Sequence, residues 1–381
     1  MNNSNRFIFM YLFTIAFACN ATQEKSLEYR SIPFNHEIID QPRLILYNTS
    51  KNFAISGGMG YEIHRNKGFN TPVRCRGYWK LLKDGKYVAA FNYEGITIEH
   101  LDCQARDRTI SMQQGCKCII DVALDAAKNI IFIAYDHPGH KSGIRQYNYD
   151  RNYSSSDYPY NDYPFKNYAK CCSLALSPKK DILCLLDNYS DITLRKTNAL
   201  GVTLKKITLP NTDSYESCIF SPDGNNLIVR GQQSIYVLDD YLNKNDIRPF
   251  WVDKGNPVAL IKGMTFHPCG LLGILTFRIR NHAPVSILYV DPITLEKIDT
   301  TSLPGRKGHN FCFRDDGLEV ALVIDNECTV GPVSLEVIKR YILPPLWMKF
   351  KMVQEQCGLS QDVLVHCMNV LTAHCSKKNY A

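Results

Sequence analysis

The sequence of 381 residues lacks the short motifs that mark the common enzyme classes. It has no Gly-x-Ser-x-Gly nucleophile turn, no Walker loop, no dinucleotide glycine fingerprint and no His-Glu-x-x-His zinc motif. A strong charge of one sign is also missing, because 44 basic residues against 37 acidic ones leave only +7 over a large surface. We therefore expect a protein that is not an enzyme, holds no cofactor or metal and binds no nucleic acid.

Long apolar runs are scarce as well. Phe7 to Ala18 form one uncharged run of 12 residues, which is shorter than the roughly 20 apolar residues of a membrane-spanning helix. This length, together with the small residues Ala16 and Ala18, predicts a signal peptide over residues 1–18. The alternative is a buried N-terminal strand or helix. With the signal peptide, we expect a protein that is secreted or lies in the periplasm or cell envelope.

The same segment resembles a bacterial lipoprotein signal, because Cys19 directly follows Ala18. That family prefers a leucine three residues before the cysteine, where this sequence has Ala16. The resemblance implies that Cys19 is lipidated after cleavage and that the mature chain is anchored to a membrane through this lipid. The alternative is a freely secreted chain.

Fifteen cysteines are the next feature, and an exported protein would be expected to oxidise exposed thiol pairs. Several cysteines instead lie in apolar, strand-like runs, where cysteine behaves as a small hydrophobic residue. These are Cys172, Cys184, Cys218, Cys312 and Cys328. The disulfide pattern stays open at this stage, and the pairs at 116–118 and 171–172 lack the spacing of a zinc site.

A sequence pattern of strands and turns repeats along most of the chain. In one copy, Cys218 to Gly224 predicts a strand and a tight turn, 225–230 a second strand, and Ser234 to Asp239 a third strand. Pro222 presets the backbone for the turn, and Gly224 tolerates a positive φ at its end.

The pattern occurs seven times, with turn markers spaced between 35 residues (Lys51 to Lys86) and 50 residues (Lys128 to Pro178). In the last copy, we expect the third strand at Ser334 to Val337. Periods of this size built only from strands are typical of β-propeller blades. A pair of β-sandwiches would also alternate strands and turns, but it would not explain why the same order of motifs occurs seven times.

The copy from Phe220 to Asp239 resembles a WD40 repeat, with Leu238 where that family most often has tryptophan. Its Ser-Pro-Asp-Gly turn also resembles periplasmic propellers of the TolB type. The resemblance implies an all-β fold, a seven-bladed WD40-like β-propeller, over residues 26–343. Leu27 to Pro33 is placed to pair with the last copy, which would close the ring and remove an open sheet edge.

Two segments fall outside the repeats. Residues 147–168 form a tyrosine-rich insertion, read either as a solvated loop or as a recognition loop in which tyrosine gives large contact area at low entropy cost. The candidate partner-binding residues of this loop are Tyr153, Tyr158, Tyr160 and Tyr163. Residues 344–381 change to helical periodicity and predict a short helical tail that covers one face of the ring or docks a partner.

These patterns favour a non-enzymatic interaction platform, a monomeric ring whose loops bind a partner protein. The alternative is a lactonase-like or glycosidase-like propeller enzyme that acts at the ring centre. The histidines near predicted strand ends would then be the first candidates, namely His137, His140, His267 and His309.

Overall fold

The computed structural model describes residues 30–32, 44–47, 53–57, 60–64, 71–74, 80–84, 87–91, 95–100, 108–111, 118–136, 142–148, 160–164, 171–210, 213–243, 246–251, 259–278, 284–303, 305, 307–342, 344–345 and 348. The regular secondary structure of these residues consists almost entirely of β-strands, so the all-β prediction is confirmed.

The described strands form seven four-stranded antiparallel sheets. Sheet 1 holds β2 (Leu44–Tyr47), β3 (Phe53–Ser56), β4 (Gly60–His64) and β5 (Thr71–Arg74). Sheet 2 holds β6 (Lys80–Asp84), β7 (Tyr87–Phe91), β8 (Gly95–His100) and β9 (Arg108–Ser111). Sheet 3 holds β10 (Cys118–Asp125), β11 (Ile130–Asp136), β12 (Gly143–Asn148) and β13 (Tyr160–Pro164).

Sheet 4 holds β14 (Cys171–Leu176), β15 (Ile182–Asp187), β16 (Asp191–Lys196) and β17 (Ala199–Thr208). Sheet 5 holds β18 (Tyr215–Phe220), β19 (Asn226–Gly231), β20 (Ser234–Asp239) and β21 (Ile247–Trp251). Sheet 6 holds β22 (Ala259–Phe266), β23 (Leu272–Arg278), β24 (Val285–Val290) and β25 (Lys297–Leu303). Sheet 7 holds β26 (Gly308–Phe313), β27 (Glu319–Ile324), β28 (Glu327–Pro332) and β1 (Arg30–Ser31).

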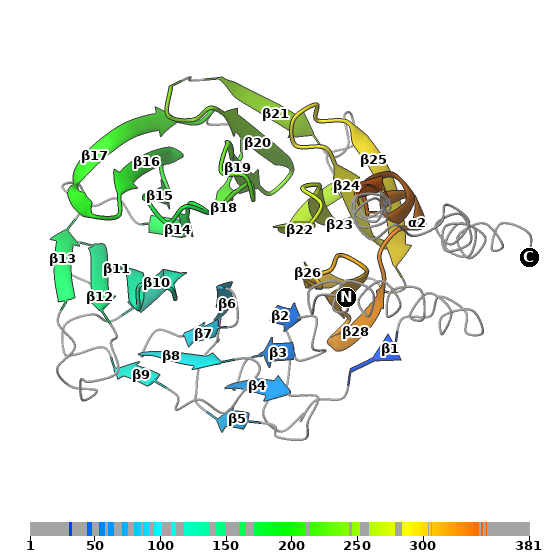
Figure 1. Ribbon diagram of the computed structural model, residues 1–381, viewed down its shortest axis with the longest axis horizontal. Helices are drawn as coiled ribbons and strands as arrows, with labels where there is room; N and C mark the ends of the chain where they lie inside the picture. The colour runs from blue at the N-terminus through cyan, green and yellow to red at the C-terminus, as the bar shows by residue number, and fades with distance from the viewer. Residues whose placement is uncertain are drawn as a thin grey trace, which may run out of the picture.

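The seven sheets are arranged around a common centre (Figure 1). The innermost strands are β2, β6, β10, β14, β18, β22 and β26. Each sheet therefore packs both faces against neighbours, which explains why middle strands such as β19 are apolar on both sides: Leu227, Ile228 and Val229 are all fully buried. Seven apolar clusters fill the seven contacts between adjacent sheets. One of them joins Ile45 of sheet 1 to Val323 of sheet 7, which makes the ring continuous.

The predicted closure by the N-terminal segment is confirmed. Strand β1 pairs antiparallel with β28, with Arg30 opposite Val330 and Ser31 opposite Thr329. The backbone N–H of Ile32 donates to the carbonyl of Cys328 at 2.7 Å, and the Ile32 side chain is buried in the contact between sheets 7 and 1. A strand from the start of the chain thus covers the edge of the sheet formed near its end.

The expected third strand of the last repeat was wrong. Asp325 and Asn326 both adopt positive φ, at 50° and 66°, so they form a tight hairpin turn and β28 starts at once. Ser334 to Val337 instead begins a helical segment, α2 (Leu335–Val337) followed by the π-helix η1 (Ile338–Ile342). The Ser334 side chain accepts a hydrogen bond from the Glu336 N–H, as an N-cap does.

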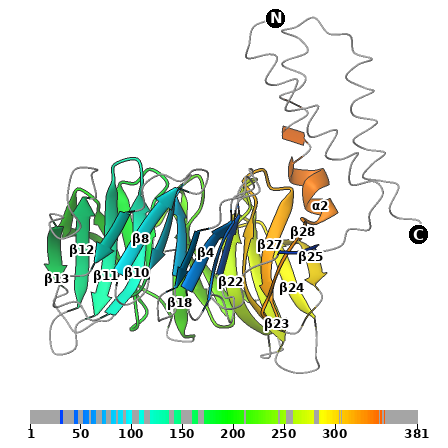
Figure 2. The same ribbon diagram turned by 90° about the horizontal axis from the view of Figure 1, so that it is seen from below.

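The helical segment therefore begins before residue 344, the predicted start of the tail. In a side view, α2 lies over one face of the ring beside the ends of β25 and β28 (Figure 2). Of the tail itself, 346–347 and 349–381 lie outside the described residues. Within the described residues, no helix has both the length and the apolarity that crossing a membrane requires.

Candidate functional site

The turns between the first and second strands share one geometry in sheets 4 to 7. In each turn the N–H of the fourth residue donates to the carbonyl of the first at 2.8 Å, as in Lys180 to Ser177 and Gly224 to Ser221. The fourth residue has positive φ in all four, which suits glycine in three of them. We call this side of the ring the turn face, and the contacts between adjacent sheets the joints.

Joint 4/5 opens into a pocket of about 330 Å³ on the turn face. It is lined by the sheet 4 turn, the sheet 5 turn and the connection after β20, at residues 177–179, 181–182, 223–226 and 240–242. Three carboxylates line this hollow, from Asp181, Asp223 and Asp240, against the single cation of Lys179. We call it the acidic pocket.

The carboxylates are held in place by their own turns. Asp181 accepts the Ser177 hydroxyl at 2.7 Å, and Asp240 accepts the Asn243 amide at 2.8 Å. Asp223 accepts from Ser221 and Asn225. Burial raises the pKa of Asp223, but these hydrogen bonds outweigh it and the net pKa is lowered, so the group stays ionised at neutral pH.

Tyr241 forms the buried wall of the acidic pocket. Its hydroxyl donates to the Gly224 carbonyl at 3.1 Å, and its ring meets Phe220 edge-on with centroids 5.2 Å apart. Burial, and to a lesser degree the negative charges of Asp181 and Asp223, raise the pKa of Tyr241 to about 12. The three carboxylates and the single ammonium of Lys179 leave the lining of the acidic pocket with an excess of negative charge. The next residue, Leu242, is 42% exposed at the rim.

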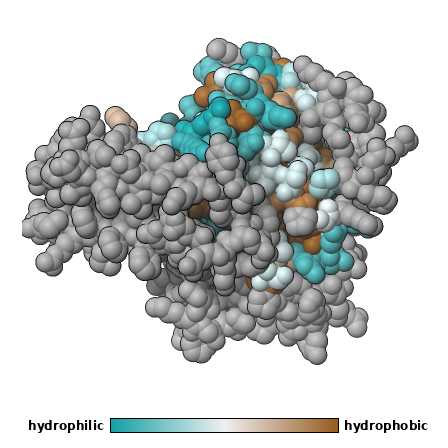
Figure 3. Space-filling view, turned by 90° about the vertical axis from the view of Figure 1, so that its right-hand side faces the viewer, coloured by the Kyte–Doolittle hydropathy of each residue, from teal (hydrophilic) through white to brown (hydrophobic). Residues whose placement is uncertain are grey.

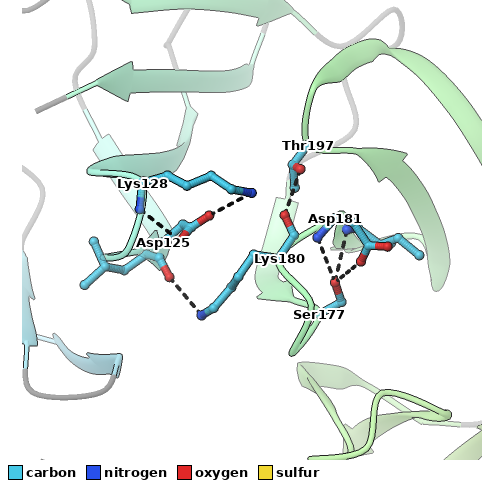
Figure 4. A network of polar contacts seen from close by, with 8 residues as sticks. Asp125, Lys128, Ser177, Lys180, Asp181 and Thr197 are labelled. Atoms are coloured by element: carbon cyan, nitrogen blue, oxygen red, sulfur yellow. Dashed lines mark hydrogen bonds and ion pairs between the residues drawn. The ribbon is translucent and has the colours of Figure 1, made fainter.

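The neighbouring joint 3/4 is bridged by a lysine (Figure 4). The Lys180 ammonium reaches across to the Leu124 carbonyl at 3.3 Å, and the Thr197 hydroxyl donates to the Lys180 carbonyl at 2.9 Å. Beside them, Lys128 pairs with Asp125 at 3.4 Å. The long side chain of Lys180 thus links the sheet 4 turn to the end of β10 in sheet 3.

Joint 6/7 is closed by a histidine. His267 is fully buried; its Nδ1 accepts the Cys269 N–H at 3.1 Å and lies 2.8 Å from the Cys269 sulfur. The proton must then be on Nε2, which donates to the Gly317 carbonyl at 2.8 Å. Burial lowers the pKa of His267 and outweighs the opposing effects of Gly317 and Asp316.

The start of the helical segment covers this same joint. Val333 and Val337 are buried in the apolar cluster of sheets 6 and 7, and Tyr341 packs against it. Figure 3 shows the side of the ring that carries this segment, where described residues of both polarities are interspersed on the surface. The helical segment therefore covers joint 6/7, whereas joint 4/5 is open to solvent at the acidic pocket.

The inner strands carry a repeated irregularity. In each of β10, β14, β18, β22 and β26, one residue is skipped in the pairing with the next strand, which makes a β-bulge. The skipped residues are Ile120, Cys172, Glu216, Lys262 and His309. They include His309, whereas His137 and His140 lie outside the described residues.

Polar groups beside these bulges serve the fold. The Asp121 carboxylate accepts the Leu174 N–H of the next sheet at 2.8 Å, and the Ser173 hydroxyl accepts the Cys218 N–H at 3.4 Å. Glu216 pairs with Arg230 at 2.8 Å. In the part of the chain that the structure describes, no three His, Cys, Asp or Glu side chains gather as a metal site.

The tyrosine-rich insertion differs from its prediction as a single loop. Tyr160 and Tyr163 belong to β13, the outer strand of sheet 3, where Tyr160 lies opposite Tyr147 and Tyr163 opposite Ile144. The repeat needed a fourth strand, and this sequence supplies it. Tyr153 and Tyr158 lie outside the described residues, as do residues 1–18 and Cys19.

The sequence reading missed Asp213, which precedes β18. Its carboxylate accepts the N–H groups of Gln232, Gln233 and Ser234 at 3.1 Å each, and so holds the turn between β19 and β20. It also missed the acidic pocket. The signal available was an Asp-Tyr-Leu run directly after the best-preserved repeat.

Comparisons with known proteins agree with the fold. No family model matches the chain, and no curated protein matches it. Among solved structures, the β-propeller domain of Myceliophteria thermophila Cps50 (Swd1) is similar, with a TM-score of 0.62 and 10% identity. The alignment covers 80% of this chain and 98% of that domain. At this identity the likeness establishes the β-propeller fold.

Proposed function

We propose that this propeller is a non-enzymatic interaction platform that binds a partner protein at the acidic pocket. The observation that carries the proposal is the open joint 4/5, where three carboxylates border a hollow large enough for one side chain. The three carboxylates outnumber the single ammonium of Lys179, which favours a negative potential there. A lysine or arginine of the partner fits this chemistry, with Leu242 as an apolar contact at the rim.

The test uses a labelled basic peptide and an acidic peptide of the same length, with binding followed by fluorescence polarisation. Asp181 and Asp240 each accept one side-chain hydrogen bond that an asparagine oxygen can also accept, so D181N/D240N keeps the turns intact. We expect this variant to bind the basic peptide about tenfold more weakly. The difference should shrink in high salt, because exposed charges are screened.

A control separates local from overall charge. Glu296 and Glu327 are exposed and lie outside the acidic pocket, so E296Q/E327Q removes the same two charges elsewhere. We expect it to bind like the wild type. Equal loss in both variants would mean that net charge, and not the acidic pocket, attracts the peptide.

Export is a second part of the proposal, supported by the apolar run from Phe7 to Ala18. The platform would then act outside the cytoplasm, either free or anchored through a lipid on Cys19. Mass spectrometry of the mature N-terminus after expression with residues 1–18 distinguishes the two forms. A start at Cys19 with added diacylglycerol supports anchoring, an unmodified start supports secretion, and an intact Met1 argues against both.

A further inference from the structure

Two buried thiols face each other across joint 4/5. Cys184 lies on β15 of sheet 4 and Cys218 on β18 of sheet 5, and their sulfur atoms are 3.7 Å apart. The two side chains are 0% and 3% exposed. They are separated by 34 residues in the chain, so a bond between them would join two neighbouring sheets and not two strands of one sheet.

The two sulfur atoms are in contact with each other. A disulfide needs a sulfur separation of about 2.0 Å, so the two sulfur atoms must move closer together than their 3.7 Å separation. The surrounding side chains are mainly apolar and include Leu186, Leu194 and Val229. Among the described residues, no three His, Cys, Asp or Glu side chains gather as a metal site, so the two thiols are not part of one.

We propose that Cys184 and Cys218 form a disulfide that ties sheet 4 to sheet 5 when the chain folds in an oxidising compartment. In the cell this inference rests on the proposed export. The oxidant is a disulfide such as oxidised glutathione. One cysteine thiolate attacks it and releases one thiol, and the second thiolate then displaces the other. Two protein thiols are oxidised and one S–S bond forms, while one S–S bond of the oxidant breaks and yields two thiols.

The bond must form before the joint closes. Burial raises the pKa of Cys184 well above its ordinary value, so its thiolate is scarce once the sheets have packed. During folding both thiols are accessible. Cys184, Cys218 and Tyr241 belong to the same apolar cluster, so the bond would stabilise the core behind the acidic pocket.

The experiment uses the full chain, refolded with oxidised glutathione, blocked with an alkylating reagent and digested without reduction. We expect a peptide that links Cys184 to Cys218. We also expect reduction to lower the midpoint of thermal unfolding by about 5 °C. Because refolding in vitro does not depend on export, a failure here is distinct from a failure of the export or peptide-binding tests.

Variants distinguish a bond from simple packing. C184A and C218A should each abolish the linked peptide and the effect of reductant on the melting midpoint, whatever they do to stability itself. C171A is the control, since its sulfur donates to the Ser173 carbonyl, and it should keep both. Alkylated Cys184 and Cys218 in the refolded wild type, or a linkage of either to another cysteine, would overturn the inference.

Discussion

Joints 4/5 and 6/7 contain the same type of turn, but a further element covers only joint 6/7. Gly224 and Gly317 occupy equivalent positions with φ of 76° and 73°. Each glycine carbonyl accepts a buried side-chain donor, the Tyr241 hydroxyl in one joint and His267 Nε2 in the other. Over joint 6/7 the chain continues into its helical segment, whereas joint 4/5 remains an open hollow bordered by carboxylates.

This comparison distinguishes the role of the repeat itself from the role of the segments that connect the repeats. The repeat supplies the sheets, the turns and the apolar clusters between them. The element that follows the third strand then decides whether a joint is interior or surface. After β28 this element is a helical segment with buried valines, and after β20 it is a short polar turn with one exposed leucine.

The largest contrast should come from placing a charge at each covering position. Val337 is 0% exposed and Leu242 is 42% exposed. V337D should destabilise the fold by about 4 kcal/mol, because the carboxylate would be buried without a partner. L242D should change stability by less than about 0.5 kcal/mol. Urea unfolding of both variants measures this, and similar losses would mean that joint 6/7 is not covered.

The two turn glycines give a closer comparison. A Cβ at Gly317 would lie 2.5 Å from the His267 ring, whereas at Gly224 the nearest atom is a Pro178 side-chain carbon at 3.4 Å. Both positions have positive φ, so alanine costs about 1 kcal/mol in either. We expect G224A to show that cost alone and G317A to cost about 3 kcal/mol. Equal melting midpoints would contradict the tight packing of joint 6/7.

Because His267 is buried in joint 6/7, we expect the folding stability to depend on pH through this residue. Burial lowers the pKa of His267 in the folded state, so the unfolded chain binds more protons below about pH 6.5. Stability should therefore fall as the pH drops through that value. H267Q removes the titrating group, and its stability should vary less between pH 7.5 and 5. Y241F at joint 4/5 should keep the wild-type slope, and parallel curves for all three proteins would exclude the assignment.

The smallest expected effect concerns the start of the helical segment. Ser334 caps α2 and its hydroxyl bonds the Asp299 carboxylate. S334A should cost about 1 kcal/mol, the usual loss of an N-cap. Binding of the basic peptide should not change, because the acidic pocket lies in another joint. A thermal melt and the polarisation assay together test this independence.

Much of this architecture was predictable because it depends on local patterns. Pro222 and Gly224 mark a turn, the apolar runs around them mark strands, and their return along the chain marks a ring. Closure by β1 followed from the need to cover an edge. Asp325 and Asn326 were missed as a hairpin turn because they lack the glycine that usually marks positive φ, and the third strand was placed too late.

The candidate site was less predictable because it depends on contacts between repeats. Tyrosine-rich composition suggested a loop, yet β13 uses Tyr160 and Tyr163 as strand residues. The acidic pocket joins residues from two turns and a connection, and no spacing in the sequence brings Asp181 next to Asp240. Sequence periodicity indicates that sheets meet, but not which joints stay uncovered.

Hydroxyl-radical footprinting of the free chain tests most directly whether one joint is open and the other covered. Leu242 should be oxidised readily and Val337 should be protected until the chain unfolds, and an added basic peptide should protect Leu242 without affecting Val337. Equal labelling of the two residues in the folded chain, or a peptide that leaves Leu242 unprotected, would contradict the account.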